Sequence, residues 1–173
     1  MHGRMSNPTD AYHGQFCDSA CRTLDEGLHK IEHCVEQLSD DDVWWRPSDS
    51  LNSIGNLVLH LSGNVRQWIV SGVGGAPDVR KRPEEFAARG SITKQKLIEV
   101  LRATVQDAKA AIRASKADAI LRPRHVQHDD VTGIDATFKS VSHFVGHVQE
   151  IVHMTRTRRG ERYQFLGIGA TSD

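Results

Sequence analysis

The chain has few cysteines and few aromatic residues, and it lacks both a net charge and a long hydrophobic run. Its three cysteines, Cys17, Cys21 and Cys34, are an odd number near one end, which favours reduced thiols over a disulfide framework. The 22 basic and 22 acidic residues give a formal charge of zero. Because no Lys/Arg block stands out, the composition indicates neither a nucleic-acid partner nor a membrane surface.

No uncharged run approaches the roughly 20 apolar residues of a membrane span. The first residues, MHGRMSNPTDAYHGQFC, lack the apolar core of a signal peptide. We therefore expect a soluble, cytoplasmic protein. A length of 173 residues suits a single domain over 1–173 with its own core, in which about ten N-terminal residues and the C-terminal tail are expected to be flexible.

Four segments carry the periodicity of amphipathic helices, with apolar residues along one stripe of each. They run from about Tyr12 to Leu38, Ser53 to Ser71, Thr93 to Ala117 and Ala136 to Arg159. No segment shows a convincing alternation of period two, including the polar loop LRPRHVQHDDVTGID before the fourth helix. The pattern predicts an all-α fold.

A long connection separates the second expected helix from the third. Its sequence, GVGGAPDVRKRPEEFAARGS, has two prolines and no sustained period. Twenty residues can span more than the ~30 Å of a 20-residue helix, so the connection can cross the bundle and leave these two helices parallel. The shorter links favour antiparallel neighbours. We predict a four-helix bundle of the up-down-down-up kind, with a long crossover between helices two and three.

Histidine is plentiful, at ten residues, and two pairs have the i, i+4 spacing that places both rings on one helix face. His29 and His33 lie among charged residues, which indicates a solvated face. His143 and His147 instead lie in a segment without charge from Ser140 to Gln149. Spacing alone therefore does not identify a metal site.

The second charge-free helical run, from Ser50 to Val65, also contains a histidine, His60. On a helical wheel, His60 and His147 are displaced to the same side of their apolar stripes. Such offsets converge when the two helices are antiparallel neighbours, and the predicted topology makes them so.

Two interpretations of these histidines compete. Each alone is best explained as a core histidine that is hydrogen-bonded to a neighbour such as Asn64 or Ser140. Three neutral imidazoles from two buried segments point instead to a divalent metal, because imidazole is a good ligand for Zn²⁺, Ni²⁺ and Fe²⁺. We predict that His60, His143 and His147 bind such a metal.

Three segments, WWRPSDSLNSIGNLVLHLSGNVRQWI, DVRKRPEEF and HFVGHVQEI, together resemble the DinB superfamily, in a branch catalogued as a domain of unknown function. The resemblance covers nearly the whole chain and implies the same up-down-down-up bundle. It also implies a divalent metal held by one histidine of the second helix and an HxxxH pair of the fourth, here His60, His143 and His147. Gln149 stands where the family often has glycine, which should narrow the packing without touching a ligand.

A three-histidine metal leaves a coordination position for water or substrate. Relatives in this superfamily are similar to transferases and isomerases that use low-molecular-weight thiols, and others resemble hydrolases. The resemblance therefore implies a metal-dependent enzyme, in particular a thiol S-transferase, and we also expect a homodimer. The alternatives are a metal-binding or stress-related protein without catalysis and a dimeric interaction module with a polar core.

Other candidates surround these ligands. Asn64, one turn after His60, is the candidate substrate contact. No residue stands out as a general base, since Glu150 fits the rim of the site and an ordinary surface position equally well.

Four residues of the loops also have open roles. Arg80 and Arg82 of the crossover could bind an anionic thiol or carboxylate, or anchor the crossover itself. His125 and His128 lie in the polar loop before the fourth helix, and either could approach the metal and raise its coordination number.

Overall fold

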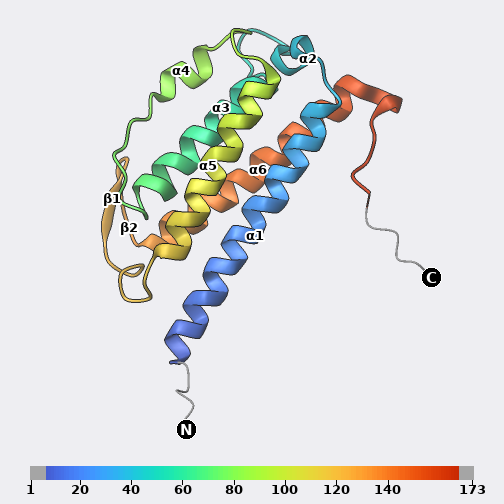
Figure 1. Ribbon diagram of the computed structural model, residues 1–173. Coiled ribbons are helices and arrows are strands. Elements are labelled where there is room, and N and C mark those ends of the chain that lie inside the picture. Colours follow the sequence, from blue (N-terminus) through green and yellow to red (C-terminus); the bar gives the residue numbers. More distant parts are fainter. Residues whose placement is uncertain (1–6, 168–173) are drawn as a thin grey trace, which may run out of the picture.

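The structure, a computed structural model, describes residues 7–167 and consists mainly of a bundle of four long helices (Figure 1). These are α1 (Pro8–Glu36), α3 (Ile54–Val65) with its π-helical continuation η1 (Arg66–Ser71), α5 (Lys94–Ala114) and α6 (Gly133–Arg159). Short helices α2 (Asp40–Trp44) and α4 (Arg82–Ala87) lie in the connections, and η2 (Gly160–Arg162) follows α6. Helices α1 and α6 run in one direction and α3 and α5 in the other, which confirms the predicted topology.

Capping side chains explain why two helices begin earlier than expected. Helix α1 starts at Pro8, because Asn7 accepts a hydrogen bond from the backbone N–H of Thr9 at 3.2 Å and proline suits the first position. This start falls within the segment expected to be flexible; residues 1–6 and 168–173, which the same expectation also covers, lie outside the described residues. Helix α6 starts at Gly133, after a capping box formed by Thr132 and Asp135.

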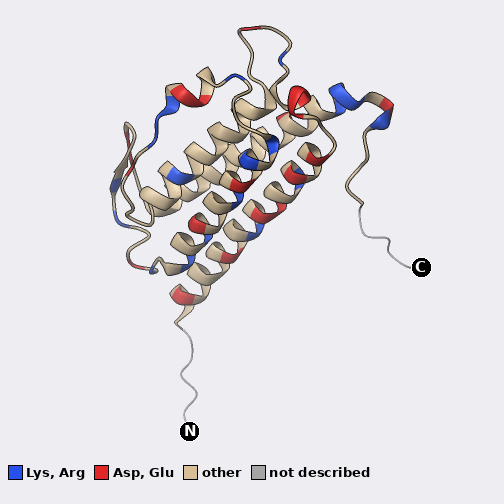
Figure 2. Ribbon diagram, turned by 45° about the horizontal axis from the view of Figure 1, so that its top comes forward, with Lys and Arg blue, Asp and Glu red and all other residues tan. Residues whose placement is uncertain are grey.

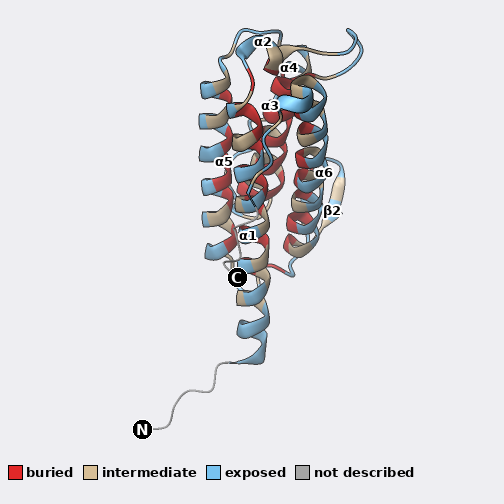
Figure 3. Ribbon diagram, turned by 90° about the vertical axis from the view of Figure 1, so that its right-hand side faces the viewer, coloured by how far each residue is buried: buried red, intermediate tan, exposed pale blue. Residues whose placement is uncertain are grey.

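The buried faces of the long helices turn inward along the whole bundle (Figure 3). Helix α1 packs against α5 and α6, and α3 packs against the same two helices, so α3 and α6 are antiparallel neighbours. Charged residues are spread along α1 and α5, whereas α3 carries none (Figure 2). No helix within residues 7–167 is long and apolar enough to cross a membrane.

The three cysteines lie in α1 and are buried and unpaired. Burial raises the pKa of the thiols of Cys17, Cys21 and Cys34. They are therefore protonated core residues at neutral pH, and none belongs to the histidine cluster described below.

The connection between α5 and α6, expected as an irregular polar loop, contains an antiparallel hairpin. Strands β1 (Arg124–Val126) and β2 (Asp129–Val131) pair so that Val126 lies opposite Asp129. Strands of three residues are too short to give a detectable alternation, so the sequence did not reveal them. Buried Val126 joins the core, and the Arg124 guanidinium donates to the carbonyl of Gly72 at 2.8 Å. The hairpin is thus fixed to the end of η1.

The long crossover is fixed against α3 by a buried asparagine. The Asn56 amide donates to the carbonyls of Glu85 at 2.8 Å and Ala88 at 3.2 Å, and its oxygen accepts a hydrogen bond from Arg46 at 2.8 Å. Helix α4 therefore lies directly beside α3, as Figure 1 also shows.

The contact between α1 and α6 depends on a glycine. A Cβ atom at Gly27 would lie 2.6 Å from the ring of buried Phe144. Gly27→Ala should therefore destabilise the protein by about 1–3 kcal/mol through overpacking. Gly14→Ala in the same helix meets no atom within 4 Å and should stabilise it by about 0.5–1 kcal/mol. Chemical denaturation measures both changes, and equal effects would show that the Gly27 contact does not limit the packing.

Candidate metal centre

Three histidines from two helices converge in the structure. His60 comes from α3, and His143 and His147 come from successive turns of α6. The ring centroids lie 5.0 Å apart for His60 and His143, 5.3 Å for His60 and His147, and 4.5 Å for His143 and His147. One ligand atom from each ring lies within 4.8 Å of the others. The antiparallel pairing of α3 and α6 brings together residues that are more than eighty positions apart in the chain.

The spacing of these nitrogen atoms suits a bound ion. The Nε2 atoms of His60 and His143 lie 2.9 Å apart. In a tetrahedral zinc site the ligand nitrogens are about 3.3 Å apart, since each Zn–N bond is about 2.0–2.1 Å. Small side-chain rotations would therefore place the three rings around one ion, and a set of imidazole donors fits zinc, nickel or iron.

The electrostatics of the cluster keep His143 neutral. Burial, followed by the charges of His147, His60, Arg80 and Arg82, lowers its pKa from 6.5 to about 4. A neutral imidazole carries the lone pair that a metal requires. His143 can therefore bind a cation at neutral pH without first releasing a proton.

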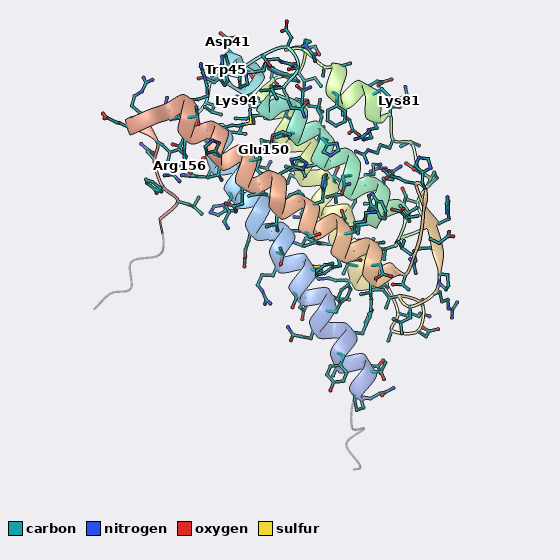
Figure 4. The ribbon with its side chains drawn as sticks, turned by 180° about the vertical axis from the view of Figure 1, so that it is seen from behind. Asp41, Trp45, Lys81, Lys94, Glu150 and Arg156 are labelled. Atoms are coloured by element: carbon teal, nitrogen blue, oxygen red, sulfur yellow. The ribbon has the colours of Figure 1, made fainter. Side chains whose placement is uncertain are left out.

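Carboxylates orient two of the three rings through their Nδ1 atoms. Glu85 accepts a hydrogen bond from Nδ1 of His60 at 3.0 Å, and Glu150 accepts one from Nδ1 of His147 at 2.7 Å; Glu150 is labelled on α6 in Figure 4. Because a carboxylate can only accept, the proton belongs on Nδ1 and the lone pair on Nε2. This carboxylate–histidine arrangement is typical of metal ligands.

Glu85 is held in place by Arg80 in a buried ion pair. The guanidinium contacts both carboxylate oxygens, at 2.7 and 2.8 Å, and the Arg80 side chain is only 4 % exposed. Burial raises the pKa of Glu85, but hydrogen bonds from Arg80 and His60 outweigh it, so the net pKa is lowered and the group is ionised. Gly63 makes room, since a Cβ atom there would lie 2.0 Å from Oε1 of Glu85.

Sequence reasoning missed the role of Glu85. It lies 25 residues from His60, beside an exposed glutamate, so neither spacing nor composition singles it out. The available signal was the segment DVRKRPEEF, which contributes to the family resemblance and contains both Arg80 and Glu85. Arg80 thus anchors the crossover, which was one of its two expected roles.

A pocket of about 510 Å³ opens beside the histidines. It is lined by residues of α3, η1, the crossover, the hairpin and α6: His60, Asn64, Gln67, Trp68, Arg80, Arg82, Gln127, His128, Lys139 and His143. Two of the three clustered histidines therefore face a space large enough for a small molecule.

The remaining candidate residues, Asn64, His125 and His128, differ in their position relative to the pocket. Asn64 is buried, lines the pocket and accepts a hydrogen bond from the hydroxyl of Ser140 at 3.0 Å. His128 also lines the pocket, whereas exposed His125 hydrogen-bonds Asp130 at 2.9 Å. Within residues 7–167, neither of these two histidines joins the three clustered ones.

The structure also shows how far His29, His33 and Gln149 are exposed. His29 is exposed on α1, and Nε2 of half-buried His33 lies 2.6 Å from the carbonyl oxygen of Gln164. The solvated face expected for this pair is thus found at His29, whereas His33 packs against the C-terminal segment. Gln149 is exposed as well, so it does not narrow the packing of α6 as expected.

Comparison with known proteins agrees with this geometry. Residues 12–172 match the family described as a protein of unknown function, DUF1572. The chain belongs to this family. No match was found among curated proteins.

Solved structures show that this DUF1572 protein has the DinB-like fold. A conserved protein from Enterococcus faecalis superposes with a TM-score of 0.66 at 18% identity, covering 80% of this chain and 94% of its own. A DinB-like protein from Bacillus cereus superposes with a TM-score of 0.65 at 7% identity, covering 82% and 91%. The predicted DinB-like fold is thus confirmed, and the family match is to a domain of unknown function, as the resemblance implied.

The buried ion pair yields a direct prediction. Glu85→Gln should lower metal affinity about 10–100-fold, because His60 loses its orienting carboxylate. It should also destabilise the protein by about 3–5 kcal/mol, since Arg80 is left buried without a counter-charge. Chelator-competition titration and chemical denaturation measure the two effects. The matched control is Glu84→Gln, next to it but exposed; equal metal affinities in the two variants would contradict the assignment.

The low pKa of His143 predicts an acid-sensitive metal-free protein. Between pH 6.5 and about 4, the unfolded chain binds a proton at His143 that the folded chain does not, so stability falls as the pH falls through this range. His143→Gln should make this dependence shallower, as denaturation with chelator present at several pH values would show.

His125 supplies a control of opposite sign. Its hydrogen bond to Asp130 raises its pKa, so it stabilises the fold below pH 6.5 and ceases to do so as the pH rises through the raised value. His125→Gln should leave the dependence between pH 6.5 and about 4 unchanged and should remove a loss of stability that occurs above pH 6.5. A shallower slope in both variants would show that the effect is not specific to His143.

Proposed function

We propose that this protein is a divalent-metal-dependent enzyme in which His60, His143 and His147 hold the metal. The observation that supports the proposal best is the joint arrangement of three converging imidazoles, carboxylates on two of them and an adjacent pocket. A structural metal site closes its coordination with protein groups, whereas three protein ligands beside a pocket are typical of a catalytic site.

The chain's own residues would each have a defined task in this site. Glu85 and Glu150 hold the rings of His60 and His147 with Nε2 free, and the buried Arg80 keeps Glu85 ionised. A bound divalent metal would supply Lewis acidity, which stabilises a thiolate or lowers the pKa of water. Asn64, at the edge of the pocket and fixed by Ser140, is the proposed substrate contact.

The finer part of the proposal is a transferase that acts on a low-molecular-weight thiol. It is supported by the resemblance to thiol-dependent members of the DinB superfamily and by a donor set compatible with zinc, nickel or iron. A cytoplasmic location, favoured by three reduced cysteines, belongs to the same proposal.

A second candidate is a dimeric module, with or without a metal. Several large apolar side chains are exposed near one end of the bundle: Tyr12 is 78%, Leu121 57% and Phe138 72% exposed. Tyr12 and Leu121 line the same shallow groove. This surface favours the predicted homodimer, which is compatible with either function.

Metal content is the first test. Protein purified without chelator should contain about one divalent ion per chain by elemental analysis, and His60→Ala or His147→Ala should remove it. Metal at about 100 times its Kd should stabilise the wild type by about 2.7 kcal/mol, which raises its melting temperature. His29→Ala, on the exposed face of α1, is the control and should keep the metal. A metal-free wild type that metal addition does not stabilise would refute the proposal.

A conjugation screen then separates enzyme from binding protein. Metal-loaded protein is incubated with several cellular thiols and electrophiles, and thioether products are quantified against the metal-free His147→Ala variant. Turnover that requires the metal supports the transferase. Retention of metal without any product would favour the non-catalytic alternative.

A further inference from the structure

The charged side chains that line the pocket beside the histidines are basic. Arg82 of α4 and Lys139 of α6 both line it, while Gln67 of η1 and Gln127 of the hairpin contribute amides. Among the described residues that line this pocket, none is acidic. A ligand inside it therefore meets cations and neutral hydrogen-bonding groups.

The three cations that line this pocket differ in how far they are already neutralised. The charge of Arg80 is already neutralised, because Arg80 pairs with Glu85. Its guanidinium also donates to the side-chain oxygen of Gln67 at 2.9 Å. Lys139 is half exposed, pairs with Asp129 at the rim and lies 4.4 Å from the Trp68 ring.

Arg82 differs from both. Its guanidinium lies 5.1 Å from the Phe86 ring, and it has no ion-pair partner within residues 7–167. The pocket thus presents one uncompensated guanidinium and one ammonium whose single partner lies outside the lining.

The hairpin is held at the pocket by a polar chain. The Gln127 amide donates to Gln67, which also donates to Asp78 at 2.7 Å. Gln127 adopts a φ of 59° in the turn, a left-handed conformation that is costly for a residue with a side chain and is often found at ligand-binding sites. The turn places Gln127 and His128 along the pocket wall, so five separate segments converge on one space.

We propose that this pocket is a subsite for a small molecule that carries a carboxylate, bound by Arg82 and Lys139 next to the histidine cluster. The proposal rests on the proposed function, whose substrate class it names. A guanidinium matches a carboxylate with two parallel hydrogen bonds, and a volume of about 510 Å³ suits a compact metabolite.

Dicarboxylate probes test this subsite on the full chain. Malonate, succinate and adipate are titrated by calorimetry at low ionic strength into metal-loaded and metal-free protein, and succinamide serves as the uncharged match for succinate. At least one dicarboxylate should bind both forms, and succinamide should bind neither. Arg82→Gln and Lys139→Gln should each weaken binding about tenfold.

The control is Lys81→Gln, which removes an exposed charge at the start of α4 (Figure 4) but does not alter the pocket lining; it should bind the probes as the wild type does. The subsite proposal would be overturned by dicarboxylate binding that survives both pocket substitutions. It would also be overturned by binding that occurs only in the metal-loaded form. The absence of any dicarboxylate binding would overturn it as well.

The two proposals fail in distinguishable ways. Elemental analysis of the same samples reports the metal site independently of the probes. If the protein contains metal but binds none of the three dicarboxylates, the subsite proposal is wrong and the metal proposal is unaffected. If the protein binds a dicarboxylate but no metal, the enzyme proposal is wrong and the pocket is an anion-binding site.

Discussion

The buried contact among Arg80, Glu85 and His60 connects the fold to the site. Arg80 and Glu85 belong to the crossover, whereas His60 belongs to α3, so the contact fixes the longest connection of the bundle against the helix that carries a proposed ligand. A charged pair this deeply buried needs close geometry to offset its desolvation. Here Glu85 accepts from both partners, and Gly63 leaves the space for its carboxylate.

This contact gives the crossover a role beyond linking two parallel helices. A twenty-residue connection is needed to bring the chain back to the start of α5, and most of its length could have been irregular. Asn56 instead binds the backbone of α4 at two carbonyls, and α4 then presents Glu85 to His60. The element that permits the topology therefore also orients a side chain of the candidate metal centre.

The sequence was informative about the bundle because long helices bury one continuous stripe. The charge-free run around His60 marked a helix that is buried on most of its faces, whereas the run around His143 is buried only at Ser140, Phe144 and Val148. The crossover length indicated that α3 and α6 are antiparallel. His29 and His33 show the limit of spacing as evidence, since the same i, i+4 spacing here leaves His29 exposed and His33 beside the backbone carbonyl of Gln164. Burial context, not the motif, separated the two pairs.

Other parts of the site depend on contacts that leave no periodic pattern. Glu85 acts on His60 through a contact across 25 residues, and its exposed neighbour Glu84 is chemically identical. The hairpin strands are too short for alternation, and their turn uses Gln127 where glycine would be the expected left-handed residue. Such positions are set by tertiary contacts, so only a structure reveals them.

The π-helical turn η1 shows how local irregularity shapes the pocket. Gly72 donates to the carbonyl of Gln67, five residues earlier, which widens the helix immediately after the turns that carry His60 and Asn64. Such turns are rare and occur frequently at functional sites. Here Gln67 and Trp68 both line the pocket, and Gln67 contacts Arg80 and Gln127 from the two flanking segments. The irregular end of α3 therefore contributes two side chains to a pocket that is built from distant segments yet lies beside the three histidines.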